Sequence, residues 1–260
     1  MDLPRNHFKA AIAEGRQQIG YWCTIDDPLM TEMAAGAGFD WLLIDAEHTA
    51  MDPRAVLGHL QAASAYPVHA MVRPSALDPA EIKKLLDLGA QSLLIPYVRN
   101  AEEAALAAAA VDYAPGGIRG LAGITRATRF GAAEGYARHA REEICLIVQI
   151  ETRSALDDLD AILATPGVDA AFVGPADLAA SLGHPGRTDH PDVRAACLDT
   201  IRRIRAAGKP AGFLTLDYEF LPKAMEAGSC FTAVDVDTAI LRRGTLESAA
   251  RWTTQAPRSG

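Results

Sequence analysis

The chain has 260 residues, of which 49% are hydrophobic and 22% are charged. This composition is typical of a globular protein and excludes wholesale disorder. Its 25 lysines and arginines are outnumbered by 33 aspartates and glutamates, which gives a formal net charge of −8. Such an acidic chain has no general electrostatic attraction for nucleic acid or for an anionic membrane, so we expect neither as a partner.

The N-terminal residues MDLPRNHFKAAIAEG lack the apolar stretch of a signal peptide. The most apolar run, residues 104–111, is too short to span a bilayer. The four cysteines form no C-x-x-C pair, and three of them lie in apolar, strand-like runs. They are typical of small buried hydrophobic residues in a reducing compartment, so the sequence predicts a cytoplasmic protein.

Short apolar runs alternate along the chain with longer segments of helical periodicity. The apolar runs predict eight strands, at residues 19–23, 41–45, 68–72, 92–95, 145–150, 170–173, 210–213 and 231–234. The periodic segments predict helices, among them residues 53–65, 79–88, 101–111 and 192–207. Asp52-Pro53 and Asp78-Pro79 each place a capping side chain before a proline at the first helical position.

Eight strands, each followed by a helix and without a break in composition, predict an α/β protein. We expect a single-domain (β/α)8 TIM barrel over residues 1–252, with a flexible C-terminal tail at residues 253–260. An open doubly wound sheet is the alternative, but it usually has a glycine-rich turn after its first strand, where this chain reads TIDDPLM. The long loop at residues 113–136, after the fourth strand, is expected to be functional or mobile.

Ionisable side chains gather where the predicted strands end. In a TIM barrel the carboxyl ends of the strands carry the chemistry. The polar residues at or just beyond these ends are Asp45, Glu47, His48, Arg73, Gln149, Glu151, Asp177, Asp235 and Asp237. The opposite ends offer only His69 and Lys209 as comparable groups. Because titratable groups cluster at functional clefts, this distribution favours a site at the carboxyl ends.

Two residue pairs are spaced two positions apart and therefore face one side of their strands: Asp45 with Glu47, and Gln149 with Glu151. Carboxylates confined together repel each other unless a cation lies among them. A hard divalent ion such as Mg²⁺ or Mn²⁺, bound by oxygen ligands, removes this conflict. Glu151 and Asp177 are the best pair of ligands, and the alternative is a rim of acids that are solvated or paired with arginines.

His48 and Arg73 are the candidates for proton transfer and charge stabilisation. Asp45 lies three residues before His48, and an Asp–His pair orients an imidazole and raises its basicity. Arg73 offers a planar donor fork to an enolate or carboxylate oxygen, with a structural salt bridge as the alternative. The turn Gly174-Pro175-Ala176-Asp177 is expected to present backbone N–H groups to an anion.

Some features of other enzyme classes are absent from the sequence. Four of the five lysines fall in helix-like segments, and Lys209 precedes the seventh strand at the wrong end for catalysis. We therefore expect neither a Schiff-base lysine nor pyridoxal phosphate. No glycine-rich phosphate loop follows the seventh or eighth strand, which disfavours a phosphosugar substrate.

Six segments, taken together and in this order, resemble the HpcH/HpaI aldolases. They are IDAEH (44–48), MVRP (71–74), IPYVRNAEEA (95–104), GGIRG (116–120), VQIET (148–152) and VGPADL (173–178). The resemblance extends from about Gly20 to Trp252. These proteins are class II pyruvate aldolases, which use a divalent metal to act on hydroxy-oxo acids.

The resemblance implies how the metal and the substrate are bound. Glu151 and Asp177 would ligate Mg²⁺, Mn²⁺ or Co²⁺. Gln149 and the backbone of Ala176 would contact the oxo acid, with Gly174 and Pro175 beside them in the same turn.

The resemblance also implies catalytic roles. Arg73 would stabilise the enolate oxygen, and His48 would be the acid/base group. Asp87 matches an acid that the family uses to raise the basicity of this histidine. Asp45 and Asp87 are therefore competing candidates for the partner of His48.

The family implies a homohexamer in which the last helix is exchanged between subunits. Phe213, at the end of the seventh strand, is expected near the mouth, where it would restrict the aldehyde; core packing is the alternative. The arginines of the long loop are candidates for binding an acceptor carboxylate, with solubility or a subunit contact as alternatives: Arg119, Arg126 and Arg129.

The sequence thus predicts a metal-dependent carbon–carbon lyase. It would reversibly cleave 4-hydroxy-2-oxo acids to pyruvate, or hydroxypyruvate, and an aldehyde. A small oxo acid and an aldehyde are then its molecular partners, along with copies of the same chain. A lyase for malyl-CoA or citramalyl-CoA and a non-catalytic barrel that binds an oxo acid are the alternatives.

Overall fold

The computed structural model describes residues 2–253, which form eight strands and twelve helices. The strands are β1 (Gln18–Cys23), β2 (Trp41–Asp45), β3 (His69–Arg73), β4 (Ser92–Ile95), β5 (Cys145–Ile150), β6 (Ala170–Val173), β7 (Ala211–Leu214) and β8 (Ser229–Val236). The helices are α1 (His7–Ala13), α2 (Pro28–Ala35), α3 (Pro53–Ala63), α4 (Pro79–Asp87), α5 (Ala101–Val111), α6 (Tyr136–Glu143), α7 (Arg153–Asp157), α8 (Leu159–Ala164), α9 (Pro175–Ser181), α10 (Pro191–Ala206), α11 (Leu221–Glu226) and α12 (Asp237–Thr253).

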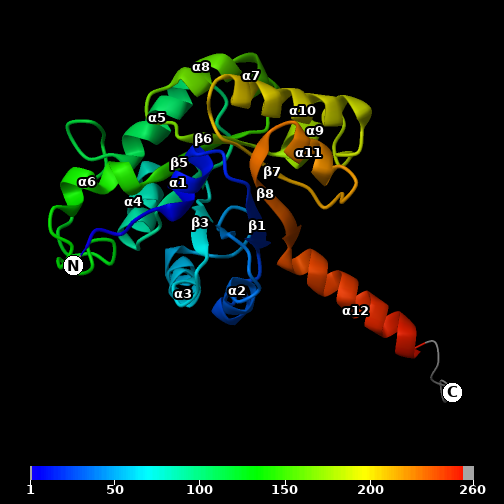
Figure 1. Ribbon diagram of the computed structural model, residues 1–260, viewed down its shortest axis with the longest axis horizontal. Coiled ribbons are helices and arrows are strands. Elements are labelled where there is room, and N and C mark those ends of the chain that lie inside the picture. The colour runs from blue at the N-terminus through cyan, green and yellow to red at the C-terminus, as the bar shows by residue number, and fades with distance from the viewer. Residues whose placement is uncertain (1, 254–260) are drawn as a thin grey trace.

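The eight strands run parallel and close into one barrel in sequence order, so that β8 pairs with β1. Helices surround this barrel (Figure 1). The predicted (β/α)8 TIM barrel is therefore confirmed. Four of the predicted strands have the observed bounds, and the other four differ by one or two residues at one or both ends.

Aspartate caps set where several helices begin. The side chain of Asp52 accepts a hydrogen bond from the N–H of Ala55, and that of Asp78 accepts one from Ala80. Asp27, before Pro28, caps α2 in the same way. Each cap satisfies one of the N–H groups that the first helical turn leaves without a partner.

The buried residues form one layer inside the barrel and another between the strands and the helices. At Gly212 a Cβ atom would lie 2.2 Å from the ring of Phe231 and 2.5 Å from that of Phe172, two interior side chains. Because successive strand residues face opposite sides, Phe213 points outward, where its ring lies 5.9 Å from that of Phe220. The expectation that Phe213 lies near the mouth is therefore wrong, and its alternative, core packing, is what the structure has.

The long loop lies at the amino ends of the strands, because α5 runs back from the mouth before the loop begins. There Arg119 Nη2 donates to Asp87 Oδ1 over 2.9 Å, and Arg126 Nη1 donates to the carbonyl of Leu88 over 2.7 Å. Arg126 and Arg129 also line a cavity of about 640 Å³ at this end. Within one chain these arginines therefore cannot bind a substrate at the mouth.

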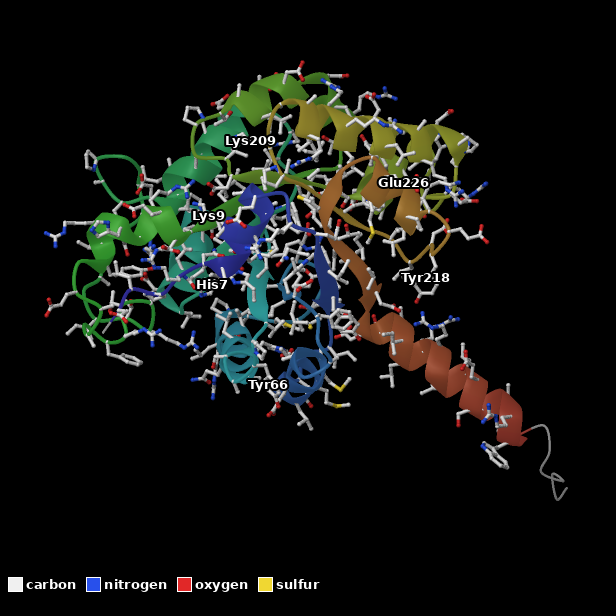
Figure 2. All side chains as sticks on the ribbon, in the orientation of Figure 1. His7, Lys9, Tyr66, Lys209, Tyr218 and Glu226 are labelled. Atoms are coloured by element: carbon white, nitrogen blue, oxygen red, sulfur yellow. The ribbon has the colours of Figure 1, made fainter. Side chains whose placement is uncertain are left out.

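The last helix, α12, points away from the barrel (Figure 1). Its first residue, Asp237, accepts hydrogen bonds from the backbone N–H groups of Thr24 and Ile25. Beyond that point Thr238 and Arg243 still contact the barrel, through the hydroxyl of Thr24 and the carboxylate of Asp235. The rest of the helix extends away from the barrel in Figure 2, and four of its large apolar side chains are exposed: Ile240, Leu241, Leu246 and Trp252.

The helix ends at Thr253, which was expected to belong to the flexible tail, and the other tail residues, 254–260, lie outside the described residues. No helix within residues 2–253 is both long and apolar enough to cross a membrane.

Candidate active site

Asp45 and Arg73 form a buried pair at the carboxyl end of the barrel. They are register partners on β2 and β3, which brings their side chains together. Arg73 Nε donates to Asp45 Oδ1 over 2.9 Å, and Nη2 donates to Oδ2 over 2.6 Å. Burial alone would raise the pKa of Asp45, but the hydrogen bonds and charge of Arg73 outweigh it and lower that pKa below its usual range.

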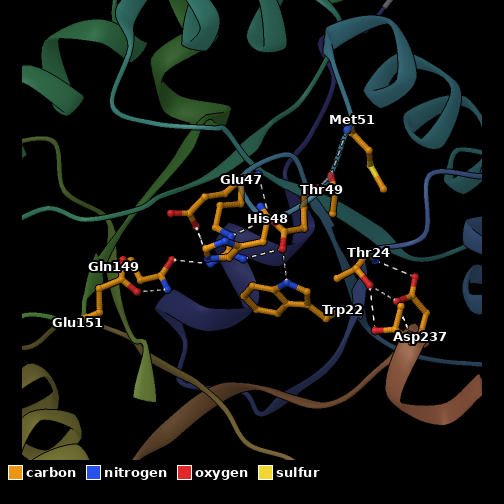
Figure 3. A network of polar contacts seen from close by, with 12 residues as sticks. Trp22, Thr24, Glu47, His48, Thr49, Met51, Gln149, Glu151 and Asp237 are labelled. Carbon is orange, nitrogen blue, oxygen red and sulfur yellow. Dashed lines mark hydrogen bonds and ion pairs between the residues drawn. The ribbon is translucent and has the colours of Figure 1, made fainter. Parts of the chain in front are cut away.

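Trp22 completes this pair from β1 (Figure 3). Its indole Nε1 donates to Asp45 Oδ2 over 3.2 Å, and its ring centroid lies 5.0 Å from Cζ of Arg73. The guanidinium is thus fixed by a bidentate carboxylate and an aromatic face. Sequence reasoning missed Trp22, although it lies at the end of the first strand.

The third guanidinium nitrogen of Arg73 faces Glu47 and Gln149. Nη1 lies 2.8 Å from Glu47 Oε2 and donates to Gln149 Oε1 over 3.5 Å. Burial raises the pKa of Glu47, although the charges of Arg73 and His48 oppose the shift. Among the described residues this buried Oε2 makes no hydrogen bond, so the ion pair with Arg73 is its main electrostatic contact.

Glu151 and Asp177 lie next to each other in the same mouth. Gln149 Nε2 donates to Glu151 Oε2 over 2.5 Å, which confirms that the two side chains face one side of the strand. Burial, followed by the nearby charges of Asp177 and Glu47, raises the pKa of Glu151 to about 8. A buried carboxylate whose neighbours include two more acids is the arrangement that a divalent cation would stabilise.

Tyr97, which follows β4, contacts both of these acids. Its backbone N–H donates to Glu151 Oε1 over 2.8 Å, and its phenol Oη donates to Asp177 Oδ1 over 2.9 Å. The hydrogen bond to Asp177 raises the pKa of Tyr97 to about 12, so the phenol remains a donor at neutral pH. Sequence reasoning missed this residue within the IPYV segment.

The Gly174 turn lets the backbone approach the acids closely. A Cβ atom at Gly174 would lie 2.4 Å from Glu151 Oε2 and 2.7 Å from Gln149 Nε2, so only glycine fits beside them. The N–H of Gly174 donates to the carbonyl of Ile150, and Pro175 has no N–H. The predicted anion-binding turn is therefore reduced to the N–H groups of Ala176 and Asp177 in the first turn of α9.

His48 lies on the β2–α3 loop, and 61% of its side chain is exposed. Its Nε2 lies 3.6 Å from Glu47 Oε2, and its backbone N–H donates to Asp45 Oδ1 over 3.4 Å. The predicted pairing of its imidazole with Asp45 is wrong, because Arg73 and Trp22 occupy that carboxylate. Asp87 is also excluded within one chain, because it ends α4 at the opposite end of the barrel and pairs with Arg119.

A second group of metal-ligating type lies in the loop between α9 and α10 and at the start of α10. His184, His190 and Asp192 offer ligand atoms within 4.8 Å of one another, and Asp192 is exposed. This group offers imidazole nitrogens as ligand atoms, whereas the acids around Glu151 at the mouth offer carboxylate oxygens. It shares none of the predicted site residues.

Fold and site together define a TIM-barrel protein with a cluster of acids, an arginine and an amide at the carboxyl ends of its strands. Residues 18–243 match the profile of the family described as HpcH/HpaI aldolase/citrate lyase. The chain belongs to this family.

The chain is 52% identical over 254 residues to a pyruvate aldolase of Rhizobium etli, covering 98% of this chain and 100% of that protein. It is 50% identical over 252 residues to a hydroxypyruvate/pyruvate aldolase of Sagittula stellata, covering 97% and 100%. A crystal structure of an HpcH/HpaI aldolase/citrate lyase family protein from Burkholderia cenocepacia superposes with a TM-score of 0.91 at 36% identity, covering 95% of this chain and 98% of that one.

Proposed function

We propose that this protein catalyses reversible aldol cleavage of 4-hydroxy-2-oxo acids to pyruvate, or hydroxypyruvate, and an aldehyde. One observation carries the proposal: Tyr97 contacts both buried Glu151 and Asp177, and Gln149 links Glu151 to Arg73. The grouping offers acidic ligands for a cation and a guanidinium for developing negative charge. The two relatives named as aldolases support the same chemistry.

A divalent cation fits this set of donors. The acids that would share it supply oxygen only, and the raised pKa of buried Glu151 indicates negative charge that its neighbours do not fully compensate. We propose that Glu151 and Asp177 would hold Mg²⁺, Mn²⁺ or Co²⁺. Such an ion would act as a Lewis acid that polarises the carbonyl of the oxo acid.

The side chains of the mouth would divide the remaining work. His48 Nε2, exposed toward the entrance, would accept the proton of the C4 hydroxyl. The C4–O electrons then form the aldehyde carbonyl, the C3–C4 bond breaks, and its electron pair leaves pyruvate as an enolate. Arg73 Nη1 and Gln149 would bind the oxygen that gains charge, and the N–H of Ala176 would bind the carboxylate. Protonation at C3 completes the cleavage.

Arg73→Ala tests this assignment. Loss of one preorganised donor is expected to lower kcat about a hundredfold or more. Arg73→Lys, which keeps the charge but loses the bidentate fork, is the matched control for folding and for the buried charge of Asp45. Near-wild-type turnover by a folded Arg73→Ala protein would make Arg73 a structural residue and contradict the mechanism.

The reaction itself is tested by incubating the protein with pyruvate or hydroxypyruvate and a panel of aldehydes, with Mg²⁺, Mn²⁺ or Co²⁺, and identifying the products by NMR. We expect hydroxy-oxo acid products that disappear after exhaustive chelation and return with the metal. Full activity in EDTA, or an imine trapped by borohydride, would contradict a class II mechanism. Turnover of malyl-CoA, or binding of pyruvate without exchange of its methyl protons in D₂O, would favour the alternatives.

We also propose that the protein is a homo-oligomer in which α12 packs on a second copy. The helix exposes Leu241, Leu246 and Trp252 away from its own barrel, and a helix face of this kind is normally covered. Leu241→Glu/Leu246→Glu is expected to lower the mass measured by light scattering. An unchanged mass would contradict the proposal. The free, buried cysteines support a reducing compartment, for which we propose the cytoplasm.

A further inference from the structure

Tyr97 has an unusual backbone conformation for an aromatic residue. Its φ is 54°, in the left-handed region where a Cβ atom crowds the backbone. Within residues 2–253 the other non-glycine residues with positive φ are Arg129 and Phe130, both in the long loop at the amino ends of the strands. Tyr97 is therefore the one at the mouth, and strain of this kind persists where the surrounding structure requires it.

The conformation of Tyr97 lets one residue contact two separate elements. The torsion φ fixes the angle between the backbone N–H and the Cα–Cβ bond, so it sets where the ring goes once the N–H is placed. The backbone N–H of Tyr97 donates to Glu151 Oε1, just after β5. In this position its phenol reaches Asp177 Oδ1 on α9. Each hydrogen bond ends on a different carboxylate, and each carboxylate keeps its second oxygen for other partners.

The second oxygen of each carboxylate remains available as an acceptor for another partner. Oε2 of Glu151 accepts only from Gln149 among the described residues, and no described donor contacts Oδ2 of Asp177. Tyr97 thus restrains the two acids from one side while leaving acceptor capacity on the other. Two like charges restrained in this way would otherwise relax apart before a cation bound.

We propose that Tyr97 is a positioning residue that holds the carboxylates of Glu151 and Asp177 at the separation a divalent cation requires. This inference rests on the proposed function, which assigns the cation to these two acids. Hydrogen-bond partners of metal ligands typically contribute 10-fold to 100-fold to metal affinity. Because 47% of Tyr97 is exposed, we expect the lower end of this range, about tenfold, for loss of the phenol oxygen.

Tyr97→Phe is the informative variant, because it removes only the phenol oxygen and keeps the backbone N–H and the ring. Tyr218→Phe is a matched control. Tyr218 follows β7 at the same mouth, and its phenol donates to a different acid, Asp235 Oδ2, over 2.6 Å. Glu151→Gln gives the baseline for loss of the cation site itself.

The experiment titrates Mn²⁺ into metal-free protein and measures free Mn²⁺ by electron paramagnetic resonance, with thermal unfolding of each metal-free variant as the check on folding. We expect Tyr97→Phe to raise the Kd for Mn²⁺ about tenfold, Tyr218→Phe to leave it within about twofold, and Glu151→Gln to abolish binding. Saturating Mn²⁺ should restore most of the kcat of Tyr97→Phe, which a merely structural defect would not allow.

Two results would overturn the inference, and they are distinguishable. If Tyr97→Phe binds Mn²⁺ as wild type does while Glu151→Gln does not, Tyr97 is no positioning residue but the proposed cation site stands. If wild type and Glu151→Gln bind Mn²⁺ equally, or neither binds it, the proposed cation site fails and this inference fails with it.

Discussion

The interior of this barrel is filled differently at its two ends. At the amino ends of the strands, α1 closes the barrel, and Phe8 packs on His69, Trp41 and Phe231. Inside the barrel at this end, His69 Nε2 lies 2.7 Å from the hydroxyl of Ser92. Outside the barrel, two buried nitrogens of Arg119, Nε and Nη1, have no hydrogen-bond partner among the described residues. At the carboxyl ends, acids crowd together around Arg73, which pairs with both Asp45 and Glu47.

The difference separates stability from function within one fold. A barrel interior filled with packed rings lowers the free energy of the folded state, whereas an end where acids crowd together is suited to binding a cation. The lysines follow the same division. Lys9 and Lys209 donate to backbone carbonyls at the amino ends, of Ile144 and Val168 respectively. Substitutions at the mouth should therefore lower activity, and substitutions at the amino ends should lower stability.

The largest effect is expected from Glu151→Gln at the mouth. Loss of a cation ligand removes several kcal/mol of transition-state stabilisation, which corresponds to a fall in kcat/KM of about a thousandfold. The free energy of unfolding of the metal-free protein should change by no more than about 1 kcal/mol, because glutamine keeps an oxygen that can accept from the N–H of Tyr97 and removes a buried acid. Steady-state kinetics measures the fall in kcat/KM, and thermal unfolding of the metal-free protein measures its stability. A large loss of stability would contradict the contrast between the ends.

Phe8→Ala should give the reverse pattern at the amino ends. Phe8 is buried among three rings, and truncation of such a side chain leaves a cavity that costs about 3–4 kcal/mol of stability. Its kcat per folded molecule should stay within about twofold of wild type, because the mouth lies at the other end. Denaturant unfolding and activity at a temperature where the variant is folded provide the measurements. A folded variant with greatly reduced kcat would show that the two ends are coupled.

The sequence predicts the barrel well because its strands are short, apolar runs separated by capped helices. It also predicts the pairs Asp45–Glu47 and Gln149–Glu151, since alternation along a strand is a local rule. Of the interpretations of the long-loop arginines, binding of an acceptor carboxylate fails within one chain, and the sequence contains the signal for this. The predicted helix at 101–111 reverses the direction of the chain before the loop begins, so the loop returns to the amino ends.

Other parts of the site depend on information that is not local. Asp45 pairs with Arg73 and not with the imidazole of His48, because strand register places Arg73 beside it. Register and competition between donors cannot be read from spacing. The role of Tyr97 depends on a positive φ that an aromatic residue rarely adopts. Asp87 was carried over by resemblance, and in one chain it lies with Arg119 at the opposite end.

The smallest effect expected here is a pH dependence that belongs to the amino ends. Burial, with a contribution from His7, lowers the pKa of His69 to about 4, whereas a histidine in an unfolded chain has a pKa of about 6.5. Between these values the unfolded chain binds a proton that the folded protein does not bind. Stability is therefore complete above about pH 6.5 and falls as the pH drops toward 4, by about 2–3 kcal/mol. His69→Gln keeps a polar group near Ser92 without a titrating group, so its free energy of unfolding should lose this part of the acid dependence.

His139→Gln, at an exposed histidine beside Glu142, is the control and should keep the wild-type profile. Parallel pH profiles for His69→Gln and wild type, measured by denaturant unfolding from pH 7.5 to 4.5, would show that His69 is protonated in the folded barrel and that the amino end is more open to water than its packing indicates.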